Sequence, residues 1–113
     1  MIINTTKNTI ITQTEEQANT FLTRLKGLLG RKFLPPEKGM LIYPCKQIHS
    51  CFMRFRFDAV FLTRDYRVVF IMEDIKPFRF SPLIREAFAV LELPAGTVRD
   101  THIEVGDLLA RKE

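Results

Sequence analysis

The stretch from Gly39 to Leu62, GMLIYPCKQIHSCFMRFRFDAVFL, decides the fold of this chain. It holds the densest apolar run, both cysteines, one of the two histidines and a lone acid, Asp58. Met40 to Tyr43 is an apolar run of strand length, and Pro44 closes it. We therefore expect a buried strand here, followed by further strands of the same sheet system.

The second half of the stretch alternates between apolar and polar residues. A strand over residues 48–57 would place His49, Cys51 and Met53 on one apolar face, because successive side chains of a strand point to opposite faces. The other face would be mostly polar and would carry Arg54. The pattern predicts one long strand that reaches Phe57.

The rest of the chain reads mainly as strands and turns. β-branched residues around a turn predict a hairpin in Met1–Thr14, and two further apolar runs around a polar turn predict another in Ala59–Met72. Ala87–Leu93 reads as a strand. Helical spacing of apolar residues predicts a helix between Asn19 and Gly30, and a T-x-x-D pattern predicts one helical turn at Thr97–Asp100.

A chain of 113 residues with 46% hydrophobic residues can form one packed core, so we expect residues 1–113 to be a single domain. The connections between the expected strands are too short for parallel crossovers. The predicted fold class is mainly β (α+β): a compact antiparallel β-sandwich or small barrel with one short N-terminal helix.

The net charge of +4 has a local source in the acid-free window Gln17–Pro36. A solvated helix face explains these basic residues more simply than a nucleic-acid site does, so nucleic acid is not an expected partner. Two cysteines are too few for a disulfide framework, and their spacing fits no zinc pattern. The chain has no membrane-spanning run and no secretory leader, so we expect a cytoplasmic protein.

Five motifs together resemble the bacterial and archaeal family known as domain of unknown function 192. The motifs occur in the same order and cover nearly the whole chain: RLKGLLGR at Arg24–Arg31, GMLIYP at Gly39–Pro44, IHSCFMRFRFDAVFL at Ile48–Leu62, AVLELPAG at Ala89–Gly96 and IEVGDLL at Ile103–Leu109. The resemblance implies a compact β-rich domain with a short N-terminal helix. It implies no established activity.

The first functional hypothesis is a non-catalytic binding module for a small polar ligand or a protein partner. Its candidate binding residues are His49, Arg54, Asp58 and Glu92, with the loop around Pro77–Pro82 as one rim. An acid flanked by apolar residues needs a partner, so Asp58 would pair with Arg54, bind a turn or contact a ligand. Glu92 presents the same choice.

Two alternatives use other residues. Cys45 and His49, with an acid, could form the nucleophile and base of a thiol-dependent hydrolase. The basic residues between Arg24 and Lys32 could instead dock an acidic macromolecule. Cys45, His49, Cys51 and Met53 could also be read as a soft-metal cluster, but core packing explains the last two better, and no metal or cofactor is expected.

Overall fold

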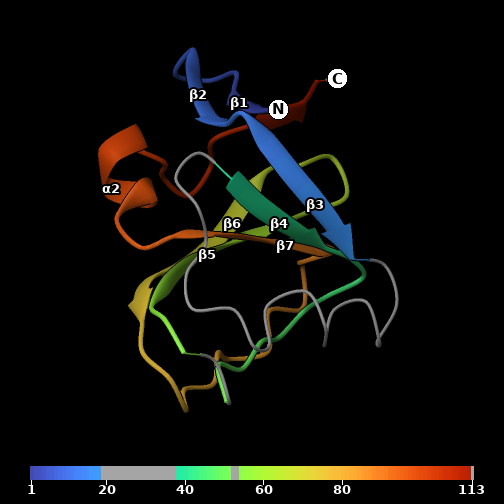
Figure 1. Ribbon diagram of the computed structural model, residues 1–113. Coiled ribbons are helices and arrows are strands. Elements are labelled where there is room, and N and C mark those ends of the chain that lie inside the picture. The colour runs from blue at the N-terminus through green and yellow to red at the C-terminus, as the bar shows by residue number, and fades with distance from the viewer. Residues whose placement is uncertain (19–37, 52–53, 113) are drawn as a thin grey trace.

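The structure is a computed structural model of the chain, and it describes residues 1–18, 38–51 and 54–112. These residues form two sheets and a short helix (Figure 1). The elements are β1 (Ile2–Asn4), β2 (Thr9–Thr12), β3 (Thr14–Ala18), β4 (Lys38–Ile42), β5 (Phe57–Leu62), β6 (Val68–Ile75), β7 (Ala89–Pro94), α2 (Thr97–Thr101) and β8 (Leu109–Arg111).

The larger sheet has five strands in the order β3-β4-β7-β5-β6. Strands β5 and β7 run antiparallel beside each other in its middle, and all six residues of β5 are buried. A strand that is buried along its whole length is typical of a sheet that is covered on both faces. The β3–β4 pair is parallel, so the prediction of antiparallel strands with only short connections is wrong for this pair.

The smaller sheet has three strands in the order β2-β1-β8 and joins the two ends of the chain. The predicted N-terminal hairpin is confirmed as β1 and β2, which pair antiparallel. Strand β8 adds to the other edge of β1, and the amino group of Met1 donates to the carbonyl of Lys112 at 2.9 Å. In Figure 1 this sheet and both termini lie at one end of the molecule, and the segments 45–51 and 76–86 lie at the opposite end.

The five-stranded sheet has a separate apolar cluster on each face, because its strands alternate. Phe57, Ala59 and Phe61 of β5 belong to one cluster, and Val60 and Leu62 belong to the other. The second cluster also contains apolar residues of the three-stranded sheet and therefore packs the two sheets together. Residues of the segments around 45–48 and 84–87 belong to the first cluster.

The predicted strand over residues 48–57 is wrong. His49 forms only an isolated bridge with Phe80, and regular strand β5 begins at Phe57. The expected inward and outward faces are also reversed at the start of this segment, since Ser50 is buried and His49 is exposed. The reason is that the hydroxyl of Ser50 binds backbone groups of a distant loop, a long-range contact that local alternation does not reveal.

The single turn of helix predicted near Thr97 is confirmed as α2, whereas its predicted T-x-x-D cap is wrong, because Gly96 is the N-cap residue. Among the described residues, therefore, the helix lies near the C-terminal end. The helix predicted between Asn19 and Gly30, including the basic residues from Arg24 to Lys32, lies outside the described residues. Across the described ranges, no helix has the length and apolar character needed to cross a bilayer.

Gly39 permits a close approach between the two sheets, and its substitution tests that packing. A Cβ atom at Gly39 would lie 2.9 Å from Cγ2 of Thr12 and 3.3 Å from the carbonyl oxygen of Glu92. Gly39→Ala should therefore lower the free energy of unfolding by about 1–3 kcal/mol in urea titrations. Thr12→Ser removes Cγ2 but keeps the hydroxyl, so the double variant should recover part of the loss; two losses that simply add would contradict this explanation.

Candidate functional site

Asp58 is a buried carboxylate that binds three backbone N–H groups. Its Oδ1 accepts from Asp74 at 2.9 Å, and its Oδ2 accepts from Gly96 at 3.1 Å and from Val98 at 2.9 Å. The β5–β6 register shifts between Phe57 and Ala59, at the position of Asp58. The acid therefore joins the start of β5, the end of β6 and the first turn of α2.

These contacts bear on two of the roles predicted for Asp58. The carboxylate binds backbone N–H groups, as expected for a turn-binding acid, and among the described residues none of these bonds comes from the guanidinium of Arg54. Arg54 is exposed. The neighbouring Arg56 pairs instead with the exposed carboxylate of Asp74 at 3.1 Å, which is worth little to stability at a solvated surface.

Glu92 is a second buried acid, but its environment is apolar. It lies on β7 between Met40 of β4 and Ala59 of β5, and only 3% of its surface is exposed. Within the described part of the chain, its Oε2 has no hydrogen-bond partner. Burial raises the pKa of Glu92 to about 8, because desolvation penalises the charged carboxylate.

The two acids face opposite sides of the sheet. In the β5–β7 register Asp58 pairs with Leu93, and Glu92 pairs with Ala59. Cross-strand partners share a face, and Leu93 and Ala59 belong to different apolar clusters. The structure therefore does not bring Asp58 and Glu92 into one cleft, although a binding role for each remains a prediction.

Cys45 and His49 have different surroundings. The buried thiol of Cys45 donates to the carbonyl of Gln47 at 3.3 Å. The exposed imidazole of His49 lies against the ring of Phe80, with 5.9 Å between the ring centroids. Cys51 is a free, half-buried thiol, and Met53 lies outside the described residues. Within the part of the chain that the structure describes, no three His, Cys, Asp or Glu side chains gather as metal ligands.

His49 instead belongs to a surface on the loop that the sequence singled out. Ring contact joins it to Phe80, and two more large apolar side chains of the same loop, Phe78 and Leu83, are exposed. We call these four residues the loop surface. The exposed fractions of Phe78, Phe80 and Leu83 are 64%, 67% and 54%. Large apolar side chains exposed on one loop are candidates for an interaction site.

The loop that carries these side chains is firmly attached to the segment 45–51. Buried Ser50 donates from Oγ to the carbonyl of Lys76 at 2.5 Å and accepts the N–H of Arg79 at 2.9 Å. Ser81 accepts the N–H of Ile48 at 2.9 Å through its own Oγ. Further along, the ammonium of Lys46 donates to two carbonyls near the end of the loop. The loop surface is therefore held in place by polar contacts beneath it.

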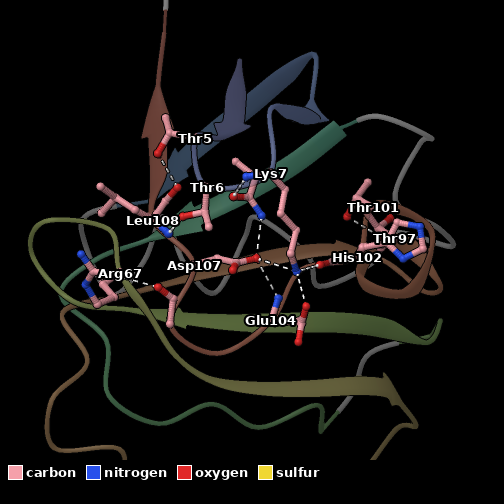
Figure 2. Close-up of polar contacts among 12 residues, drawn as sticks. Thr5, Thr6, Lys7, Arg67, Thr97, Thr101, His102, Glu104, Asp107 and Leu108 are labelled. Atoms are coloured by element: carbon pink, nitrogen blue, oxygen red, sulfur yellow. Dashed lines mark hydrogen bonds and ion pairs between the residues drawn. The ribbon is translucent and has the colours of Figure 1, made fainter.

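A third polar cluster surrounds Asp107 and joins the two ends of the chain (Figure 2). Asp107 Oδ2 accepts from Asn4 Nδ2 at 2.7 Å and lies 3.1 Å from Nζ of Lys7, which also pairs with Glu104 at 2.6 Å. Burial raises the pKa of Asp107, but the hydrogen bonds from Asn4 and others outweigh it, so the net pKa lies below its ordinary value. Nothing local in the sequence indicates these contacts, because Asn4 and Lys7 lie about a hundred positions from Asp107.

The chain is similar in sequence to proteins of one family. The sequence model of the family domain of unknown function 192, described as Uncharacterized ACR, matches residues 2–110. A UPF0127 protein of Pyrococcus furiosus is 32% identical, with 96% of this chain and 95% of that protein aligned. Neither description assigns an activity.

Two solved structures are similar to this fold. A protein of unknown function from Novosphingobium aromaticivorans superposes with a TM-score of 0.84 at 25% identity, covering 97% of this chain and 82% of that one. A Sinorhizobium meliloti protein, described as a proposed transcription regulator, gives a TM-score of 0.74 at 30% identity and covers 85% of this chain and 79% of its own.

Replacing Asp58 tests its structural role. In Asp58→Asn one carboxylate oxygen becomes an amide NH2, which cannot accept the backbone donors that the oxygen bound. The free energy of unfolding should fall by about 2–4 kcal/mol in urea titrations. Asp74→Asn, at an exposed acid in an exposed ion pair, should cost less than about 1 kcal/mol. Equal losses in the two variants would refute the role of Asp58.

The raised pKa of Glu92 predicts how stability depends on pH. The folded state keeps the proton up to about pH 8, whereas the unfolded state releases it near 4.5, so stability is lost as pH rises through this range. The slope should be about 1.4 kcal/mol per pH unit, although other groups add to it. The stability of Glu92→Gln relative to wild type should therefore increase from pH 4.5 to 8.

Exposed Glu86 provides the matched control for this measurement. Glu86→Gln makes the same chemical change at the surface, so its stability relative to wild type should stay constant across this pH range. Urea unfolding at several pH values measures both differences. A flat difference for Glu92→Gln would show that the carboxyl titrates at its ordinary pKa in the folded protein.

Proposed function

The chain belongs to the domain of unknown function 192 family, whose sequence model matches residues 2–110, and on this premise we propose that it is a non-catalytic binding module. The module holds a protein partner at the loop surface of His49, Phe78, Phe80 and Leu83. One observation carries the proposal: three large apolar side chains project from a loop that polar contacts fix from below.

Fixed loops bind with a smaller entropic cost than mobile ones. Each side chain or backbone segment that is ordered only on binding reduces affinity, so a loop that is already ordered retains more of its contact energy. The backbone of Phe78 supports this view, because its φ of 61° is unusual for a bulky residue and costs free energy. Such a conformation persists only where the surrounding contacts hold it.

The charge of the loop indicates the chemistry of the partner. Residues 76–85, KPFRFSPLIR, contain Lys76, Arg79 and Arg85 and no acid, and all three basic residues are exposed. An acidic segment that also carries apolar side chains would complement this surface. Burial of an exposed Phe or Leu contributes about 1.5–3 kcal/mol, and the charges contribute mainly to orientation and association rate.

Three features of the module remain part of this proposal. Residues 1–113 would form one domain in which the two sheets pack as a sandwich, supported by the apolar cluster that they share. A cytoplasmic location is supported by Cys45 and Cys51, which are not joined in a disulfide and so suit a reducing compartment. The small-ligand and thiol-hydrolase alternatives stay predictions, and the loop surface favours neither.

A displayed library of random peptides provides the test. Selection on the wild-type protein should enrich sequences in which Asp or Glu flanks aromatic or aliphatic residues. The Phe80→Ser, Leu83→Ser double variant should bind a selected peptide at least about tenfold more weakly, because two apolar anchors are lost. Fluorescence anisotropy with the labelled peptide measures the affinity.

Two other exposed apolar residues provide the control. Ile10 and Val105 are 50% and 62% exposed and lie outside the loop surface. The Ile10→Ser, Val105→Ser double variant removes apolar groups of similar exposure, so it should bind the peptide as wild type does. Equal weakening by both double variants, or a selection without any enriched sequence, would overturn the proposal.

A further inference from the structure

Strand β6 forms one edge of the five-stranded sheet. In the strand order its neighbour is β5, and the described residues place no other strand beside it. It is also the longest of the described strands. An edge strand presents backbone donors and acceptors that can pair with a strand of another chain. The edge of β6 is therefore a candidate surface for such a strand.

The register shows which backbone groups of β6 point away from the sheet. Phe88 donates its N–H to the carbonyl of Leu62, so the backbone groups of Leu62 face β7. Because these groups alternate along a strand, those of Val60 face β7 as well. Ile71 lies opposite Val60 in the β5–β6 pair, so its N–H and carbonyl point away from β5. Outside the strand ladders, no backbone bond among the described residues involves Ile71.

Two features limit the available edge to the middle of β6. At its start, the N–H of Val68 donates to the carbonyl of Asp107 at 2.9 Å, and the carbonyl of Val68 accepts the N–H of Gly106 at 2.8 Å. This end of the edge is therefore already occupied. At the other end Asp74 has a φ of 52°, which departs from the extended conformation. The part that remains available is residues 69–73, which we call the open edge.

The open edge is apolar along most of its length. Its sequence is VFIME, and the side chains of residues 69–72 are only half-buried. Charged residues and proline commonly shield an edge strand, and residues 69–72 contain neither. Met72 packs against one apolar cluster of the sheet and Ile71 against the other. A strand added here would therefore cover apolar groups on both faces.

Opposite charges stand at the two ends of the open edge. Glu73 ends it and is exposed. At the other end, Nη1 of Arg67 donates to the carbonyl of Gly106 at 2.8 Å, which holds the guanidinium beside the edge and leaves it further donors. No ion pair among the described residues involves either side chain. An antiparallel partner strand with the same sequence would bring each acid toward the other chain's base.

We propose that two copies of this chain pair through their open edges, with a twofold axis at Ile71. In this register Ile71 lies opposite the partner's Ile71, and Val69 lies opposite the partner's Glu73. The partner strand then stays clear of the occupied end of β6. A twofold interface repeats every contact, so both Glu73 carboxylates approach an Arg67 guanidinium. A second copy fits this edge because both complementary charges belong to one chain.

Sedimentation equilibrium measures the dimer. A single strand pair buries less surface than a permanent dimer does, so the dissociation constant should be about 100 µM. Glu73→Arg places like charges together and should raise this constant at least about tenfold. The Arg67→Glu, Glu73→Arg double variant exchanges the two charges, so it should recover most of the wild-type affinity.

Glu86→Arg is the matched control, because Glu86 is an exposed acid outside the open edge and its replacement changes the net charge equally. It should dimerise as wild type does, and circular dichroism reports whether each variant is folded. The proposal does not involve the loop surface, so the Phe80→Ser, Leu83→Ser variant should also dimerise normally. A chain that stays monomeric up to about 1 mM would overturn the proposal. So would equal weakening by Glu73→Arg and Glu86→Arg, a double variant as weak as Glu73→Arg, or loss of the dimer in the loop-surface variant.

Discussion

The buried carboxylate of Asp58 is the constraint on which the C-terminal half of this fold depends. A charge without partners in an apolar interior would be very costly, so the chain must bring donors to it. Three backbone N–H groups, from Asp74, Gly96 and Val98, meet this requirement. They lie on two segments far apart in sequence, and satisfying one side chain therefore fixes the end of β6 and the start of α2 together.

Glu92, on the neighbouring strand β7, is also a buried acid, but it is accommodated in a different way. Its position in the middle of the five-stranded sheet leaves one carboxyl oxygen without a hydrogen-bond partner among the described residues, and the group keeps its proton instead. A neutral carboxyl costs less free energy to bury than a charged one, but Oε2 gains no hydrogen bond among the described residues that would offset the cost. Asp58 therefore has a structural explanation, whereas the described contacts give none for Glu92.

The sequence predicted the parts of the structure that depend on local pattern. The apolar runs located β4, β5 and β7, and turn residues located the hairpins of β1–β2 and β5–β6. The sequence-based prediction failed where a side chain binds a segment distant in sequence. Ser50 is buried because it binds a loop almost thirty residues away, and this reverses the expected buried and exposed faces around His49. The candidate site failed to converge for a similar reason, because only the β5–β7 register reveals that Asp58 and Glu92 lie on opposite faces.

The segments 45–51 and 76–86, which carry the loop surface, lie at one end of the molecule in Figure 1, and both chain termini lie at the opposite end. The described contacts hold the loop in one arrangement, because Ser50 and Ser81 bind backbone groups of the two segments. For the proposed binding module, this favours a partner that docks on a preformed surface over one that reshapes the loop, since less conformational entropy is lost on binding.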